Sequence, residues 1–439
     1  MKRDLSRWFR WVVFGILISG TWNGDAQEKR ESFLKGASGK SYLPSLEMLR
    51  DLGVEAFRPE LNWKLVEPDV PEGLLTVNEV RQQPELIDRY LAEKDWTRLD
   101  RLVDPLIENG IQVVAVVGLG YNSGLPRYQK GLATPNALGR ETYLGRIYLY
   151  ARATVRRYRD RVMLWQIENE LNEAGLTSFY GWRSPAPSVM GLAGARKSYW
   201  NDFGFLTELL ATLAEAVRIE APGKPTVLNF HTDIHDVVHQ RVGWLAGKKT
   251  WSDAIRAWSK YLDWIGIDAY PNYYAADPIL FADIEMRIQK VKSLGLGKPI
   301  VVLETAYPVP IGETPPEPVD WDEAKQARYI EGAIEGAHRA GARGFFYFGL
   351  GRSGARPPAG GYSPKDLDAL TRLGQAFRGG DVGGLLTGIV RYGPTYLRKR
   401  FPEVLMGAEG YGLLREDGSQ RPGYRVLKDW YARPLEWKR

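Results

Sequence analysis

The chain has no cysteine in its 439 residues. It therefore contains neither disulfide bonds nor thiolate metal ligands, and in an exported compartment its stability has to come from a large hydrophobic core. The apolar share of 44% and the charged share of 26% are typical of a soluble globular protein, and the chain is long enough to bury such a core.

A block of basic residues is also missing. The formal net charge of +6 is spread along the chain, and Lys and Arg gather only in short groups such as RKR at residues 398–400. Because nucleic-acid-binding surfaces usually need a larger basic patch, we expect no nucleic-acid partner.

The apolar run near the N-terminus is too short for a typical membrane helix. It covers residues 11–20 (WVVFGILISG), about half of the roughly 20 residues that a membrane helix needs. Basic residues precede it, and the small residues Gly24 and Ala26 follow it. This is the pattern of an export signal over residues 1–26, so we expect a secreted or periplasmic protein without stable membrane insertion after cleavage. If the signal is retained, the protein is membrane-anchored instead.

From about residue 31 onward, short apolar runs typical of β-strands alternate with longer helical patterns such as residues 95–110 and 323–341. The eight runs cover residues 32–38, 54–61, 111–118, 162–169, 225–231, 264–270, 299–305 and 344–350. Eight strand-helix units are the number in a closed barrel, and near-continuous apolar strands fit a parallel sheet covered by helices. We therefore predict an α/β protein with a (β/α)8 TIM barrel and an extended C-terminal segment.

An open, doubly wound sheet is the competing fold. It normally carries a glycine-rich phosphate loop after its first strand, and KGASGKSY at residues 35–42 lacks the glycine spacing of that loop. The sequence therefore favours the barrel.

The domain organisation is predicted to be simple, because no internal repeat is evident. The Pro-rich segment 307–320 and the Gly/Pro-rich segment 351–364 follow strands seven and eight, so we interpret them as loops at the rim of the barrel and not as linkers. Residues 27–439 then form a single catalytic barrel. Helices are predicted over 364–377 and 421–432; we expect the second to close the barrel and residues 352–410 to be an insertion before it.

Two glutamates stand at strand ends where a barrel enzyme places its reacting groups. Glu170 follows strand four in WQIENELN, and Glu304 ends strand seven in VVLETAYP. A single glutamate at a strand end is usually a solvated loop residue, but two on strands that face each other across the barrel mouth are a sharper signal. Glycoside hydrolysis needs such a pair, one acid to protonate the departing oxygen and one carboxylate to attack or to activate water.

These two motifs resemble those of a known group of enzymes. WQIENELN (Trp165–Asn172) is similar to the Asn-Glu signature of clan A retaining glycoside hydrolases, and LETAYP (Leu303–Pro308) is similar to their nucleophile strand. The resemblance implies that Glu170 is the acid/base, that Glu304 is the nucleophile and that Asn169 donates a hydrogen bond to the sugar 2-hydroxyl.

The resemblance extends to further substrate-site residues. Arg58 in FRPELNW matches the strand-two arginine that the clan places near the nucleophile, and Tyr270 in IDAYP matches the strand-six tyrosine that hydrogen-bonds it. Phe348 departs from the pattern, because the clan usually has a tryptophan under the reacting sugar on strand eight; a phenyl ring can still stack on a sugar. Asp268 stands where some relatives have a histidine, and no role follows for it. The tail, residues 411–430, resembles the end of many of these barrels.

Other candidate residues are weaker. His231, His235 and His239 repeat every four residues, but His231 ends strand five, so the three do not share one helix and we expect no metal site and no cofactor. We predict that His231 contacts the sugar. Aromatic residues at the rim are candidates for stacking, each about as easily explained by packing: Trp63, Tyr121, Trp182 and Tyr307.

The two glutamates beside Glu170 need separate explanations. Glu168 precedes it by two positions and either orients Glu170 or pairs with an arginine, the second being favoured. Glu173 is predicted to be a solvated loop residue.

The sequence leaves several functions open. The leading hypothesis is an exported retaining β-glycosidase acting on a carbohydrate substrate, a plant or microbial glycan. A non-hydrolytic glycan-binding barrel or a transglycosylase on the same scaffold is the alternative, and a metal-dependent lyase or an aldolase is a third. The motifs ETAYP and DAYPNYY resemble those of arabinogalactan endo-galactanases, whereas FRPELNWKLVEP resembles exo-acting β-xylosidase-like and β-galactosidase-like barrels, so the substrate stays open.

Overall fold

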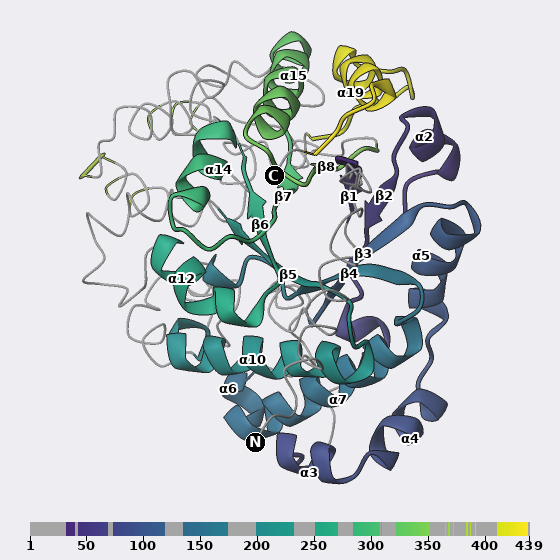
Figure 1. Ribbon diagram of the computed structural model, residues 1–439, viewed down its shortest axis with the longest axis vertical. Helices are drawn as coiled ribbons and strands as arrows, with labels where there is room; N and C mark the ends of the chain where they lie inside the picture. The colour runs from purple at the N-terminus through teal and green to yellow at the C-terminus, as the bar shows by residue number, and fades with distance from the viewer. Residues whose placement is uncertain are drawn as a thin grey trace, which may run out of the picture.

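The protein folds into a closed barrel of eight parallel strands surrounded by helices (Figure 1). The computed structural model describes residues 32–39, 43–68, 73–118, 135–173, 199–231, 251–270, 284–307 with 309, 322–351 and 411–437, together with isolated positions between 365 and 391. Each strand pairs in parallel with the next in sequence, and the last pairs with the first. The predicted (β/α)8 barrel is confirmed.

The eight strands lie close to the predicted runs. They are β1 (Leu34–Ser38), β2 (Ala56–Arg58), β3 (Gln112–Val117), β4 (Val162–Ile167), β5 (Thr226–His231), β6 (Trp264–Asp268), β7 (Ile300–Thr305) and β8 (Gly344–Phe348). β2 is much shorter than the predicted run 54–61. Pro59 follows it directly and has no backbone N–H for the ladder, so regular pairing stops there and only an isolated bridge from Glu60 to Val116 continues it.

Helices cover the outside of the barrel. The described α-helices are α2 (Leu46–Asp51), α3 (Val77–Gln82), α4 (Glu85–Glu93), α5 (Thr97–Glu108), α6 (Pro135–Leu138), α7 (Arg140–Tyr158), α10 (Phe203–Glu220), α12 (Trp251–Trp258), α14 (Ile284–Lys292), α15 (Glu323–Arg339) and α19 (Pro422–Ala432). Short 3-10 turns are η1 (Trp63–Leu65), η4 (Leu171–Glu173), η5 (Tyr199–Asn201) and η6 (Ser259–Tyr261). Among these described helices, none is long and apolar enough to cross a membrane.

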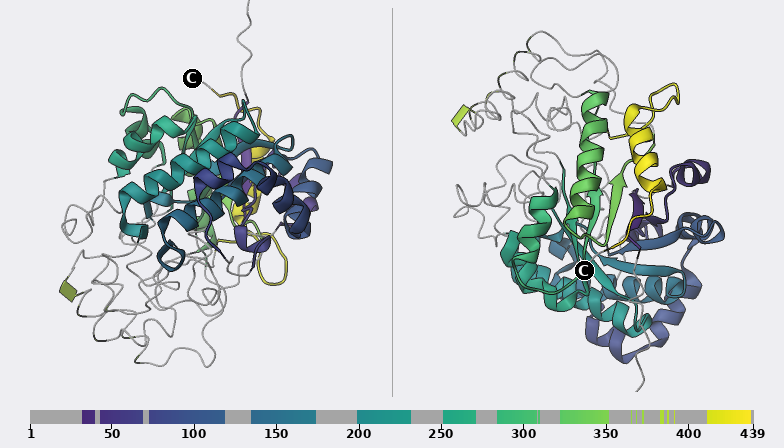
Figure 2. Two further views of the ribbon diagram at one scale, coloured as in Figure 1. Left: turned by 90° about the horizontal axis from the view of Figure 1, so that it is seen from below. Right: turned by 45° about the horizontal axis from the view of Figure 1, so that its top comes forward.

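The C-terminal helix α19 packs beside α15, next to the seam between the first and last strands (Figures 1 and 2). The Tyr431 hydroxyl donates to the carbonyl oxygens of Gly36 in β1 (2.6 Å) and Phe345 in β8 (3.0 Å), both at buried positions. The tail thereby ties together the two strands that close the barrel. Apart from isolated positions, the predicted insertion 352–410 and the predicted helix 364–377 lie outside the described residues.

The inside of the barrel has an apolar layer and a polar layer. Side chains from seven strands fill the apolar layer: Leu34, Ala56, Val114, Leu164, Val227, Val301, Leu303 and Phe346. Polar side chains occupy the carboxyl ends of the strands above it, and all of them are buried: Ser38, Arg58, Gln166, Asn229, Asp268 and Glu304. Because apolar side chains fill the barrel below them, the polar side chains of the interior lie together at the carboxyl ends of the strands.

Gly36 makes room for the largest side chain of the apolar layer. A Cβ atom at Gly36 would lie 2.3 Å from Cδ1 of the Phe346 ring. We expect Gly36→Ala to reduce the free energy of unfolding by about 1–3 kcal/mol, the usual cost of overpacking a core. Gly332→Ala is the matched control, because this exposed α15 position has no atom within 4 Å of its Cβ and should gain about 0.5–1 kcal/mol. Equal effects of the two changes in urea denaturation would contradict this account of the barrel interior.

Candidate active site

Glu170 and Glu304 meet at the carboxyl end of the barrel. Glu304 lies in β7 and Glu170 follows the end of β4. One carboxylate oxygen from each lies within 4.8 Å of the other, together with an oxygen of Asp268. The Glu304 side chain is 7% exposed and that of Glu170 is 21% exposed, so Glu170 is the more accessible of the two. This separation is close to the roughly 5–5.5 Å that characterises retaining glycosidases and is shorter than the spacing of inverting ones.

Glu304 is held by two donors. Arg58 Nη1 lies 2.8 Å from its Oε1, and the Tyr270 hydroxyl donates to its Oε2 at 2.8 Å. Burial lowers the pKa of Arg58, but the charges of Glu304 and other acidic neighbours outweigh burial and raise it. Burial and the charge of Glu304 also raise the pKa of Tyr270 well above its usual value. Both groups therefore stay protonated and can face Glu304 as a cation and as a hydrogen-bond donor.

Asn169 is oriented by the same arginine. Its Oδ1 accepts hydrogen bonds from Arg58 Nη2 and from Asn229 Nδ2, both at 2.6 Å. Since the oxygen is occupied by these donors, the side-chain Nδ2 is the group that Asn169 can offer to a substrate hydroxyl. Arg58 thus contacts both Asn169 and Glu304, and the predicted hydrogen bond from Asn169 to a sugar hydroxyl stays a prediction.

Asn229 and Gln166 complete the network, and the sequence analysis missed both. Asn229 Oδ1 accepts from the backbone N–H of Glu170 (2.9 Å) and from Gln166 Nε2 (2.6 Å). Gln166 Oε1 in turn accepts from Arg58 Nε at 2.5 Å. These bonds connect β2, β4 and β5. An amide inside an otherwise apolar strand, as in TVLNFH and VMLWQI, is the signal that could have identified them, because a buried amide needs partners.

The backbone around Glu170 is strained. Glu168 and Glu170 both have positive φ angles, 59° and 47°, in the left-handed region that non-glycine residues rarely adopt. Such strain persists only where the surroundings enforce it, and here the Asn229 side chain holds the N–H of Glu170.

The Glu168 carboxyl lies beside Gly118 and Leu213. Its Oε1 lies 2.8 Å from where a Cβ atom at Gly118 would be, next to Leu213 of α10, and the side chain is fully buried. Its charge also contributes, after burial, to raising the pKa of Tyr143 and Tyr150 in α7. The Glu168 carboxyl therefore lies in the layer between strand ends and helices, and its predicted pairing with an arginine stays a prediction.

Aromatic rings surround the carboxylates. The Tyr270 ring centroid lies 5.8 Å from that of His231, 6.3 Å from that of Phe348 and 5.4 Å from that of Tyr411. His231 Nε2 lies 3.9 Å from Glu170 Oε1. His231 and Phe348 are thus brought to the site as predicted. Tyr411 was missed, because no strand pattern points to a residue in the C-terminal tail.

Two other predicted aromatic residues belong to the core. Trp63 is 5% exposed, its Nε1 donates to Glu67 at 2.9 Å, and its ring stacks on Tyr150 at 6.1 Å. Trp63 therefore lies in the core with its ring against α7, and its predicted contact with the sugar stays a prediction. Tyr307 is fully buried and packs on Tyr329. The remaining predicted positions lie outside the described residues, namely the export signal, Tyr121, Trp182, His235, His239 and the side chain of Glu173.

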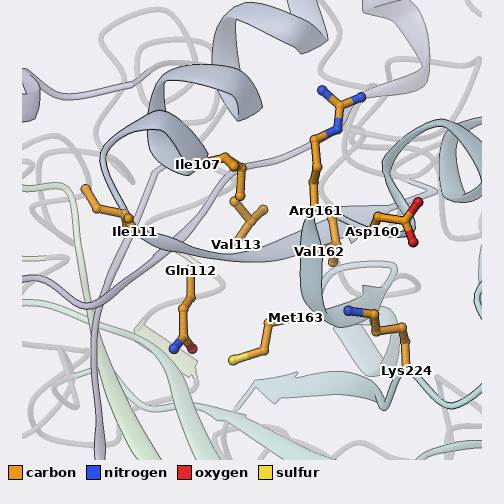
Figure 3. Close-up of a pocket in the computed structure, with 10 residues that line it drawn as sticks. Ile107, Ile111, Gln112, Val113, Asp160, Arg161, Val162, Met163 and Lys224 are labelled. Atoms are coloured by element: carbon orange, nitrogen blue, oxygen red, sulfur yellow. The ribbon is translucent and has the colours of Figure 1, made fainter.

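A separate open cavity of about 380 Å³ lies at the amino ends of β3 and β4 (Figure 3). Its lining includes Gln112 and Val113 from β3, Val162 and Met163 from β4, and Lys224 just before β5. It opens at the barrel end opposite the carboxyl cluster, so it has no part in the chemistry of Glu170 and Glu304.

Three carboxyl groups close together are also oxygen ligands of the kind that divalent cations prefer. Here, however, the charge of Arg58 already sits 2.8 Å from Glu304, and a second positive charge beside it would be repelled. The position of Arg58 therefore disfavours a metal ion between Glu170, Asp268 and Glu304.

Comparison with known proteins identifies the fold. No protein-family model and no curated protein sequence matches the chain. Among solved structures, an exo-β-1,4-mannosidase from Opitutaceae bacterium strain TAV5 matches with a TM-score of 0.51 and 14% identity, over 92% of this chain and 60% of the mannosidase. The GH53 catalytic domain of Ignisphaera aggregans matches with a TM-score of 0.48 and 16% identity, over 90% and 91% of the two chains.

A GH2 β-galacturonidase from Eisenbergiella tayi matches with a TM-score of 0.49 and 14% identity, over 93% of this chain and 52% of that enzyme. The chain thus spans about half the length of the galacturonidase. At such low identities the comparisons establish the barrel fold alone. These three solved structures are glycoside hydrolases.

Proposed function

We propose that this protein is a retaining glycoside hydrolase that cleaves β-glycosidic bonds of a polysaccharide or oligosaccharide. The observation that carries the proposal is the pair of carboxyl groups of Glu170 and Glu304, with oxygens within 4.8 Å, at the carboxyl end of the barrel. The donors on Glu304 support it, since a nucleophile must stay ionised while its partner acts as an acid.

The mechanism has two displacements. Glu304 attacks the anomeric carbon while Glu170 gives its proton to the departing glycosidic oxygen, so the carbon–oxygen bond breaks as the Glu304 ester forms. Glu170, now a carboxylate, then takes a proton from water, which attacks the same carbon and releases Glu304. Arg58 and Tyr270 stabilise the nucleophile, and Asn169 donates to the sugar 2-hydroxyl.

The aromatic side chains support a carbohydrate substrate. Tyr270, Phe348 and Tyr411 form an edge-packed group next to the nucleophile, and aromatic faces pack well on the C–H faces of sugar rings. We further propose that residues 1–26 direct export, so the enzyme meets its glycan outside the cytoplasm. The sugar and the choice between internal and terminal bonds depend on loops outside the described residues.

Product stereochemistry tests the proposal. A panel of β-linked polysaccharides and aryl β-glycosides, including mannosides, galactosides, galacturonides, glucosides and xylosides, should contain at least one substrate. NMR of the first-formed product should show the β anomer, because two inversions at one carbon give net retention. Formation of the α anomer first would contradict the close carboxylate pair.

A non-hydrolytic glycan-binding barrel is the second candidate, favoured by Phe348 in place of the expected tryptophan. It predicts saturable binding of an oligosaccharide by calorimetry with no reducing ends released over long incubation. A transglycosylase would instead release sugar onto an added acceptor, which product analysis on the same panel distinguishes.

A further inference from the structure

Asp268 is a third carboxyl group in the site that the two-carboxylate mechanism does not use. It ends β6, aligned with His231 of β5 on one side and with Glu304 of β7 on the other, and it is fully buried. Its Oδ2 accepts a hydrogen bond from Asn229 Nδ2. Within the described part of the chain, its Oδ1 has no hydrogen-bond partner although it is buried.

The charged and titratable groups around Asp268 lie on or just after five different strands. They are Arg58 on β2, Glu170 after β4, His231 on β5, Tyr270 after β6 and Glu304 on β7. Oxygens of Asp268, Glu170 and Glu304 lie within 4.8 Å of one another, and the Arg58 guanidinium contacts Glu304. Arg58 is the permanent cation of this set and also faces the buried Glu60, so it offsets one negative charge and not two.

Carboxylates this close in a buried site cannot all be ionised without a large cost in free energy. Burial, followed by the charges of Glu304 and Glu170, raises the pKa of Asp268 well above its usual value, against smaller opposing effects of Arg58 and Asn229. A protonated Asp268 would also give its Oδ1 a hydrogen to donate, while Oδ2 still accepts from Asn229.

Building on the proposed function, we propose that Asp268 is a positioning residue that stays neutral in the working enzyme, so that the site carries one negative charge opposite Arg58 throughout the reaction. In the free enzyme that charge is on Glu304. When the glycosyl ester forms, Glu304 loses its charge, the Glu170 proton leaves with the glycosidic oxygen, and Glu170 becomes the carboxylate. The charge moves between the two glutamates, and the sum with Arg58 stays zero in both states.

Infrared spectroscopy tests the protonation state directly and does not depend on activity. With ¹³C-labelled aspartate side chains, the wild type at its pH of maximal activity should show the carbonyl band of a protonated aspartyl group. The band should be lost in Asp268→Asn and kept in Asp429→Asn, an exposed control on α19. Should Asp268→Asn fail to fold, the wild-type titration still decides the question, because a fully ionised aspartate spectrum at that pH would overturn the proposal.

The pH profile tests the catalytic consequence. Asparagine resembles the neutral acid and cannot ionise, so in Asp268→Asn the alkaline limb of kcat/KM should stay in place or move to higher pH. An ionised Asp268 would hold the proton on Glu170 to higher pH by charge repulsion, so a limb that moves to lower pH in Asp268→Asn would overturn the proposal. Lack of glycosidase activity in the wild type would instead defeat the proposed function, while the infrared band would still report on Asp268.

Discussion

Glu304→Gln is expected to lower turnover by about 10⁴-fold or more, the scale seen when a catalytic nucleophile is removed. The amide keeps an oxygen that can accept from Arg58 and Tyr270, so the fold should survive, but it cannot form the glycosyl ester. Steady-state kinetics on the best substrate of the panel gives the rate, and circular dichroism with thermal unfolding verifies the fold.

Glu331→Gln is the matched control for this variant. It makes the same chemical change at an exposed position of α15, and it should have wild-type kinetics and stability. If Glu304→Gln turned over substrate at the wild-type rate, Glu304 could not be the nucleophile.

Glu170→Ala is expected to slow hydrolysis by about 10²–10⁴-fold for natural glycosides, whose leaving groups need a proton. For activated aryl glycosides the first displacement should be nearly normal, since those leaving groups depart as anions, and loss of the base should then slow the second step. The glycosyl-enzyme would accumulate, giving a burst of released phenol in stopped-flow measurements.

Added azide provides the decisive measurement on Glu170→Ala. This small anion needs no base and can attack the glycosyl-enzyme from the side on which Glu170 stood, so it should restore turnover and give the β-glycosyl azide. Glu304→Gln, which cannot form the intermediate, should give no β-azide. An equal loss of rate for all leaving groups would contradict the assignment of Glu170 as acid/base.

Much of the fold could be predicted from the sequence, because local patterns encode it. The eight apolar runs correspond to the eight observed strands, and the pattern over 323–341 corresponds to α15 at Glu323–Arg339. Boundaries were less accurate. β2 ends three residues before the predicted position, since the missing N–H of Pro59 interrupts the ladder, an effect that a hydrophobicity pattern does not register.

Part of the site could be located in the same way. Glu170 and Glu304 follow apolar strands in the linear sequence, and parallel strands of a closed barrel bring their ends to one mouth. The sequence left the environment of Trp63 open, because an aromatic residue near a strand end gives the same pattern whether it faces the barrel mouth or packs on a helix. Glu168 likewise shares the strand parity of Glu170, and only the left-handed backbone reveals where its carboxyl goes.

The sequence by itself determined the alternation of strands and helices, the order of the strands and the two glutamates at the mouth, because each depends on neighbours in the chain. Tertiary structure alone decided which polar groups share the site with them. Asn229 reaches Glu170 across 59 positions, and Tyr411 reaches Tyr270 from the C-terminal tail. The motif IDAYP contains Asp268, but the two other carboxyl groups that raise its pKa come close to it only when the barrel closes.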